Sequence, residues 1–125
     1  MLNITLVKLS DTKMHDKSNP ATRLTKIVHE YNSAAHPLEA VDVALTTVSG
    51  TYPATGWAAN EVCSMIYYIL HGTAVLTSED GQTFALEPRD ALLLLPKTWY
   101  TITGDFEALM VCAPAWYKEQ SRSKA

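Results

Sequence analysis

The stretch from Ser64 to Thr101 reads SMIYYILHGTAVLTSEDGQTFALEPRDALLLLPKTWYT. In it, short apolar segments alternate with turn signals at His71-Gly72, Asp80-Gly81 and Pro88-Arg89-Asp90. Ile and Tyr fit the half-buried surface of a sheet, and Asp-Gly tolerates the positive φ that hairpin turns need. Segments this short, spaced about ten residues apart and separated by turns, predict an antiparallel barrel or sandwich.

A helical interpretation of the run Ala91–Leu95 is disfavoured by its neighbours. Pro88 and Pro96 enclose it, and they leave fewer residues than a stable helix needs. Outside the stretch, alternation and β-propensity predict further strands at Ile4–Leu9, Leu24–Tyr31, Val41–Val48 and Phe106–Ala113. For Leu24–Tyr31 a short helix is the alternative.

The order of these turns resembles the cupin superfamily. Cupins have a Leu-x-Gly turn, an Asp/Asn-Gly turn, a Pro-Gly-Asp turn and a Pro in this order, and the chain has Leu70-His71-Gly72, Asp80-Gly81, Pro88-Arg89-Asp90 and Pro96. The chain departs from the pattern at Arg89, where the family usually has Gly. The resemblance spans residues 45–114 and implies a single-domain, all-β fold, the double-stranded β-helix or RmlC-like jelly-roll barrel. It implies no particular activity, because this fold hosts many chemistries.

A chain of 125 residues supports one domain. We divide it into N-terminal strands with a polar arm at a dimer interface (1–44), the barrel (45–117) and a polar C-terminal tail (118–125) that we expect to fray. The two cysteines, Cys63 and Cys112, do not make a disulfide framework. The first residues show no basic start, apolar block or cleavage site, so we expect a cytoplasmic protein.

The charge and hydropathy of the chain limit its partners. A net charge of −3 gives no electrostatic reason to expect nucleic acid or an anionic membrane surface. The longest apolar run is far shorter than the ~20 residues that a membrane-spanning helix needs. We expect a small molecule as the ligand. We also expect a homodimer, because Ala91–Leu95 is apolar on both faces and one small barrel cannot cover both. The alternative is a monomer whose own N-terminal strands supply the cover.

Most cupin enzymes hold a divalent metal, through His-x-His, a following Glu or His, and a final His. Counted from the Leu-x-Gly turn and from Pro96, the first two ligands fall within residues 58–61, the third at Met65 and the last at Thr101. The histidines of the chain are His15, His29, His36 and His71. None lies in these windows, so we expect no metal and no other cofactor. A metal held by His29 or His36 from outside the motif is the alternative.

A barrel without its metal must fill its lumen with side chains or with a ligand. Strand alternation puts the residues before the Leu-x-Gly turn on an inner face, with Tyr100 or Thr101 across the lumen and two tryptophans near the mouth. Small-molecule pockets have this apolar character with a few polar tips, and so do packed cores. The candidate ligand-binding residues are Trp57, Glu61, Cys63, Met65, Tyr67, Trp99, Tyr100 and Thr101.

Glu61 and Tyr67 are the best candidates for catalysis. In an apolar pocket the pKa of Glu61 would rise and the carboxyl would suit general acid or base chemistry; the alternative is an exposed loop position. A buried Tyr67 phenol needs a partner and can act as an acid. Cys63 has no His near it in sequence, so we interpret it as an inert core thiol. Trp57 and Trp99 are also typical of residues that plug the end of a barrel.

Three functions remain open from the sequence. The first is a metal-independent module that binds or senses a small molecule. The second is a metal-independent isomerase, epimerase or lyase that acts on a sugar or a small acid inside the barrel. The third is a structural dimer whose lumen is packed. A ligand screen separates the first two from the third.

Overall fold

The structure of the chain is a computed structural model. It describes residues 40–125, the single residues 6, 8 and 10, and four short strands: β1 (Lys13–Asp16), β2 (Thr22–Lys26), β3 (Asn32–Ser33) and β4 (His36–Pro37). The strand expected at Leu24–Tyr31 is confirmed as far as Lys26, and its remainder lies outside the described residues. The strand expected at Ile4–Leu9 lies almost wholly outside them as well.

Residues 40–125 form an antiparallel β structure. Its elements are β5 (Asp42–Tyr52), β6 (Trp57–Asn60), β7 (Ser64–Ser78), β8 (Thr83–Leu86), β9 (Ala91–Leu94), β10 (Tyr100–Ala113), the short 3-10 helix η3 (Lys118–Gln120) and β11 (Ser121–Lys124). Every strand pair in the described part of the chain is antiparallel, which confirms the all-β prediction. Within these described elements, no helix has the length and hydropathy needed to cross a membrane.

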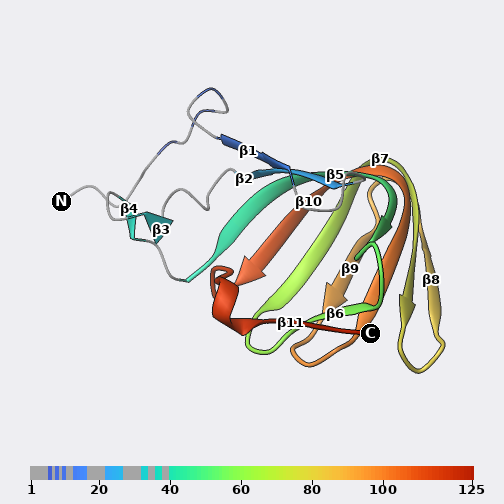
Figure 1. Cartoon of the computed structure of the whole chain (residues 1–125). Coiled ribbons are helices and arrows are strands. Elements are labelled where there is room, and N and C mark those ends of the chain that lie inside the picture. The colour runs from blue at the N-terminus through green and yellow to red at the C-terminus, as the bar shows by residue number, and fades with distance from the viewer. Residues whose placement is uncertain are drawn as a thin grey trace.

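Three long strands build the barrel. β10 lies between β5 and β7 and pairs with both over most of its length. β7 pairs with β9 through its first half and with β8 through its second half. The long strands therefore bend and belong to both walls, as their curvature shows, while β11 runs beside β6 (Figure 1). The hairpin predicted at Asp80-Gly81 is confirmed as the turn between β7 and β8.

At the bend, the backbones of β7 and β10 are so close that no Cβ atom fits between them. Gly72 has a φ of +78°, and a Cβ there would collide with the carbonyl oxygen of Asp105. A Cβ on Gly104 would collide with the carbonyl oxygen of Thr73. Glycine is required at both positions because the two backbones touch there. The break expected at His71-Gly72 is therefore the bend of one continuous strand, and that prediction was wrong in this detail.

A β-bulge at Leu70 changes which side chains of β7 face inward. Consecutive residues of β10 pair with Ile69 and His71, which leaves Leu70 outside the ladder. Before the bulge the odd-numbered residues are buried, and after it Ala74 and Leu76 are buried. The bulge thus keeps both halves of the bent strand directed at one core.

The turn at Glu87–Asp90 is fixed to β7 beside the bulge. Arg89 donates its backbone N–H to the carbonyl of Ile69 at 2.8 Å, and Ile69 donates to the carbonyl of Asp90 at 3.0 Å. Arg89 has a φ of +74°, and this left-handed conformation costs an L-residue roughly 1–2 kcal/mol. The cost explains why the barrels that this sequence resembles usually have Gly at this point.

The C-terminal segment does not fray as expected. β11 pairs with β6 along its whole length, and Gln120, which precedes β11, is 2% exposed. The side chains of β11 are all exposed, so its polar sequence did not predict a strand. Backbone pairing and one buried amide, that of Gln120, hold the strand in place.

The outer face of the barrel wall is apolar over a contiguous area. Cross-strand pairing aligns two rows of residues across β9, β7, β10 and β5. Three members, Ile66, Tyr68 and Leu93, are 38%, 37% and 60% exposed. Exposed apolar side chains that lie side by side on a sheet are typical of an interaction surface. We call it the outer patch, and its rows are Leu93, Ile66, Val111 and Val43, and Ala91, Tyr68, Leu109 and Leu45.

We propose that a second copy of the chain covers the outer patch, because an apolar sheet face is stable in water only when another layer covers it. Light scattering at micromolar concentration should give twice the chain mass of 13.8 kDa. Leu93→Asp should give a monomer, since it puts a charge on the most exposed large apolar side chain of the patch. Gln82→Asp, at the exposed hairpin turn, is the matched control and should stay dimeric. A wild-type monomer at high concentration would refute the pairing.

Candidate functional site

The barrel encloses one small cavity between β5, β7 and β10. Its volume, measured as space open to the centre of a water molecule, is about 50 Å³. At roughly 10–15 Å³ per water, this is room for about three to five waters. We call this space the lumen cavity, and its lining includes Asp42, Thr46, Met65, Tyr67, Tyr100 and Trp116.

β5 lines the lumen with small and polar residues. Its inward positions are Asp42, Ala44, Thr46 and Val48, while its larger apolar residues belong to the outer patch. The register with β10 fixes this choice, since Asp42 lies directly opposite the buried Cys112. This orientation of β5 leaves free volume and polar atoms inside the barrel. If the opposite face of β5 pointed inward, its larger apolar side chains would fill that volume.

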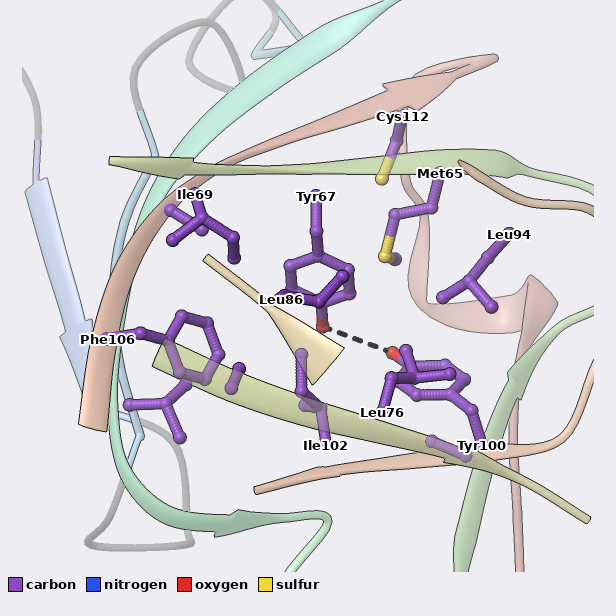
Figure 2. Close-up of a cluster of buried hydrophobic side chains, with 14 of the residues drawn as sticks. Met65, Tyr67, Ile69, Leu76, Leu86, Leu94, Tyr100, Ile102, Phe106 and Cys112 are labelled. Carbon is purple, nitrogen blue, oxygen red and sulfur yellow. Dashed lines mark hydrogen bonds between the residues drawn. The ribbon is translucent and has the colours of Figure 1, made fainter. Parts of the chain in front are cut away.

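Two tyrosines from different strands meet in the lumen cavity. Tyr67 of β7 and Tyr100 of β10 point toward one another, with 3.4 Å between their hydroxyl oxygens (Figure 2). Their rings lie edge to face, with centroids 6.4 Å apart and an interplanar angle of 74°, an arrangement that aromatic pairs favour. The two residues are 2% and 3% exposed, so this contact is sealed from bulk water.

Burial keeps these phenols neutral. Removal from water raises the pKa of Tyr67 and of Tyr100 well above the ordinary tyrosine value, and the same cause raises the pKa of Tyr52. A neutral phenol donates one hydrogen bond and accepts others, but it is no general base. The pair is therefore suited to holding a ligand oxygen by hydrogen bonding.

Asp42 brings a carboxylate to the same cavity. The residue is 4% exposed, and its Oδ2 accepts the backbone N–H of Trp116 at 2.9 Å. A carboxylate buried to this extent must be stabilised by hydrogen bonds or charge partners. Burial raises the pKa of the Cys63 thiol, and the negative charge of Asp42 adds to that effect. Asp42 therefore carries the negative potential of this end of the lumen.

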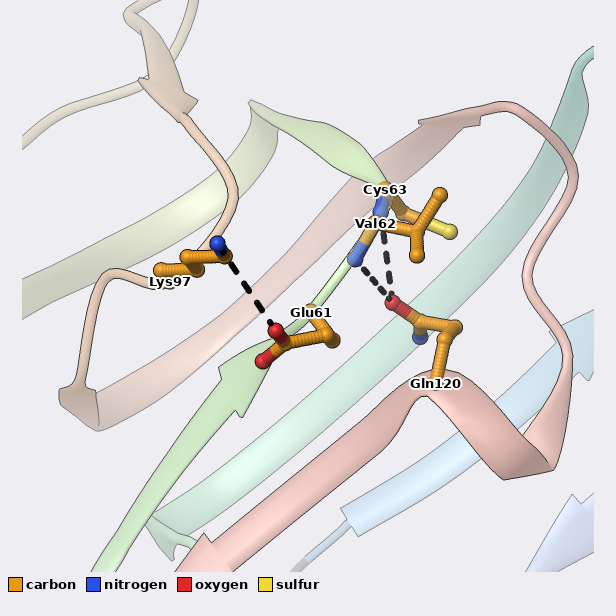
Figure 3. A network of polar contacts seen from close by, with 5 residues as sticks. All are labelled: Glu61, Val62, Cys63, Lys97 and Gln120. Carbon is orange, nitrogen blue, oxygen red and sulfur yellow. Dashed lines mark hydrogen bonds and ion pairs between the residues drawn. The ribbon is translucent and has the colours of Figure 1, made fainter.

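The C-terminal segment closes one side of the lumen cavity and is fixed by Gln120. Its Oε1 accepts the backbone N–H groups of Val62 and Cys63 at 3.3 and 3.2 Å (Figure 3). Its Nε2 donates to Oδ1 of Asn60 at 2.9 Å. One buried amide thus ties the C-terminus to the connection between β6 and β7.

Glu61 does not face the lumen, and its expected inward position is corrected. It lies in the connection after β6, where its side chain is 42% exposed and points to Lys97 (Figure 3). The Oε1 to Nζ distance is 3.9 Å, and the Lys97 side chain is 72% exposed. The alternation fails because Glu61 precedes β7 rather than belonging to it. The exposed-loop interpretation of Glu61 is the correct one.

Three of the expected ligand-binding residues line the lumen cavity: Met65, Tyr67 and Tyr100. Between Tyr100 and Thr101, left open by the sequence, the structure puts Tyr100 inside. Thr101 lies between the buried Tyr100 and Ile102 in β10 and so faces the other way.

The remaining candidates lie outside the cavity lining. Cys63 is fully buried in the core, and its raised pKa keeps it a thiol, which fits an inert core cysteine. Trp57 is half-buried in β6, opposite Lys124 of β11. Trp99 is half-buried, with the Lys124 Nζ 4.5 Å from its ring centroid. The two tryptophans therefore flank the C-terminal strand.

A second hollow lies on the surface between β8 and β9. It is larger, about 500 Å³, but it is open to solvent. The leucines of β9, of which Leu93 is exposed, line much of it together with Trp99. Its acidic residues, Glu79 and Asp80, are exposed. We assign the candidate site to the lumen cavity, because an enclosed apolar space with a few converging polar groups is typical of ligand sites.

Among the described residues, no three His, Cys, Asp or Glu side chains come together in a way that could hold a metal. His71 is exposed at the bend of β7. Of the positions that the family resemblance gave to metal ligands, the last two hold Met65 and Thr101, which supply neither imidazole nor carboxylate. The window for the first two, residues 58–61, holds one carboxylate, Glu61, which points to Lys97. The alternative through His29 or His36 lies outside the side chains that the structure describes.

Comparison with known proteins identifies the fold. No family model and no curated protein matches the chain in sequence. Among solved structures, the Streptomyces protein Pac13, described as a nucleoside dehydratase and solved with uridine, matches with a TM-score of 0.80 at 16% identity, over 98% of this chain and 92% of Pac13. The polyketide cyclase RemF from Streptomyces resistomycificus matches with 0.72 at 17%, over 98% and 86%.

KdgF from Halomonas matches with a TM-score of 0.69 at 16% identity, over 90% of this chain and 94% of KdgF. These neighbours are cupin-fold proteins, and the matches confirm the expected cupin-type barrel. At such low identity they establish the fold alone.

The sequence analysis missed the part of the site that comes from outside the quoted stretch. The missed lining residues belong to β5, to β6, to the end of β10 and to the C-terminal segment. One signal was present, because Asp42 and Thr46 are four residues apart in the strand Val41–Val48 and so lie on the same face of it. The missed residues include Asp42, Thr46, Tyr52, Asn60, Trp116 and Ser121.

Gln120→Ala should lower the free energy of unfolding by about 2–3 kcal/mol, because it leaves buried donors and an acceptor without partners. Glu61→Gln should change it by less than about 0.5 kcal/mol, because an exposed ion pair contributes little. Chemical denaturation of the two variants measures both values. A loss at Glu61 as large as the loss at Gln120 would contradict the assigned positions.

Proposed function

We propose that this cupin-fold chain binds a small organic molecule in the lumen cavity without the help of a metal. The observation that supports the proposal most directly is the convergence of buried polar groups on an enclosed space. Asp42 and Thr46 come from one strand, and Tyr67 and Tyr100 come from two others. Polar groups are costly to bury, and a barrel that needed only a packed core would be more stable with apolar residues at these positions.

The structural neighbours are consistent with the proposal. Pac13 is described with uridine, and RemF as a polyketide cyclase. Both descriptions concern small organic molecules, and both proteins have barrels of this type. The ligand of the present chain must be small, because the free volume around the Tyr67–Tyr100 pair, about 50 Å³, is that of roughly three to five waters.

Ala58→Val should fill part of the lumen cavity and block ligand binding, because Ala58 is 7% exposed and lines the cavity. Its free energy of unfolding should stay the same or rise, since the added methyl groups enter empty space. Ala108→Val is the matched control: Ala108 is fully buried and does not line the cavity, so overpacking should cost about 1–3 kcal/mol. A fragment library screened by thermal shift, followed by denaturation of both variants, provides the measurement.

Two results would count against the binding function. If Ala58→Val destabilises the protein as much as Ala108→Val does, the lumen is packed and the structural-dimer function is favoured. If fragments bind wild type and Ala58→Val equally, their site lies elsewhere, with the surface hollow between β8 and β9 as the next candidate.

A second candidate function is a metal-independent isomerase or lyase. The specific observation in its favour is a buried carboxylate, Asp42, in the same cavity as two neutral phenols. In this function Asp42 removes a proton from carbon next to a carbonyl, while the Tyr67–Tyr100 pair hydrogen-bonds the oxygen on which negative charge develops.

Asp42→Asn should abolish proton abstraction and keep the fold, because the amide oxygen still accepts the N–H of Trp116. The measurement is NMR of proton–deuteron exchange at the methyl groups of acetone in D₂O. Wild type should accelerate the exchange over buffer, and Asp42→Asn should not. Exchange at the buffer rate with wild type would remove this enzymatic alternative and leave simple binding.

A further inference from the structure

The Tyr67–Tyr100 pair has one more hydrogen than it has partners. Each phenol carries one O–H donor and lone pairs that accept, and the two oxygens are 3.4 Å apart. Whichever hydroxyl donates to the other, the second O–H finds no acceptor among the described residues. Both tyrosines are at most 3% exposed, so the unused donor lies away from bulk water.

The unused donor belongs to the lumen cavity, because both tyrosines line it (Figure 2). A buried donor without an acceptor is unfavourable, and native structures seldom keep one. An oxygen atom of a bound molecule inside the cavity would satisfy it. The pair is thus complete only when the cavity is occupied by an acceptor.

We propose that the lumen cavity binds an uncharged organic molecule whose carbonyl-type oxygen accepts a hydrogen bond from the Tyr67–Tyr100 pair. This inference rests on the proposed function and deepens it by naming the class of ligand. The apolar body of the molecule lies against Val48, Met65 and Met110, which line the same space. Methionines adapt their shape to apolar ligands.

The charges of the lining select against ionised ligands. Asp42 is the one charged side chain among the described residues that line the cavity. An anion would meet this carboxylate in an apolar space, and like charges repel strongly there. A cation would be attracted by Asp42, but an ammonium group has no lone pair to accept the phenol hydrogen. A neutral acceptor satisfies the pair without adding charge.

Four ligands of similar shape test the inference. Acetone carries the carbonyl, isobutene has a methylene in place of the oxygen, acetate is the anion, and isopropylammonium is the cation. Each has four non-hydrogen atoms, which matches the cavity of about 50 Å³. Binding is measured by NMR of the methionine methyl groups at pH 7, because Met65 and Met110 line the cavity. Acetone should bind about 5- to 10-fold more tightly than isobutene, the value of one neutral hydrogen bond. Acetate and isopropylammonium should bind more weakly than acetone.

Substitution of the phenols tests the source of the preference. Tyr67→Phe and Tyr100→Phe each leave one hydroxyl, whose hydrogen then goes directly to the ligand, so each single variant should keep a preference for the ketone. The double variant should lose the preference for acetone and bind isobutene more tightly, because the carbonyl oxygen then gives up its hydrogen bonds to water without a replacement. Its binding of the hydrocarbon shows that the barrel is folded. Tyr68→Phe, in the outer patch, is the matched control and should behave as wild type.

The outcomes separate this inference from the proposed function. If wild type binds acetone and isobutene equally, or either charged ligand more tightly than the ketone, the lumen still binds small molecules and only the ligand class is wrong. If the double variant keeps the preference, the phenols are not its source and the inference fails. If none of the four ligands binds, the inference and the proposed function both fail for molecules of this size.

Discussion

The antiparallel pairing of β7 with β10 is the interaction on which the rest of the structure depends. Both strands bend where they touch, and the contact requires Gly72 and Gly104 because no Cβ fits between the two backbones. The bulge at Leu70 then shifts the inward face of β7 from odd to even positions. Without that shift, one half of the strand would turn its apolar side chains outward, and the two walls could not share a core.

This pairing also explains why the lumen is incompletely filled. β10 also pairs with β5, and the register of this pairing turns the small and polar residues of β5 inward. The larger apolar residues of β5 then belong to the outer patch. Tyr67 and Tyr100 cross the remaining space and meet each other, and Asp42 lies at the end held by Trp116. Burial holds the phenols neutral, so the cavity combines neutral donors with one carboxylate. We propose that such a lining recognises hydrogen-bonding oxygen better than it recognises charge.

The outer patch and the lumen cavity are consequences of the same choice of face. A strand has only two faces, so turning Asp42 and Thr46 inward puts the larger apolar residues of β5 outside. There they continue the rows formed by β7, β9 and β10. The cavity inside and the apolar patch outside therefore have the same cause, the register between β5 and β10. A protein with this register has an apolar outer face to cover as well as a lumen to fill.

The sequence by itself determined the fold, because turn chemistry is local: Asp80-Gly81 and the turn before β9 are readable without tertiary contacts. It also indicated Tyr67, because alternation counted from the recognised turn put this residue on the inner face. It left Tyr100 and Thr101 open, because a slip of one residue exchanges the two faces of a strand. Only the tertiary structure placed Asp42 in the lumen cavity, Glu61 near the surface beside Lys97, and the Gln120 side chain in the buried interior. Those positions depend on where a strand begins, on cross-strand register and on contacts between residues far apart in the chain, and no local pattern encodes them.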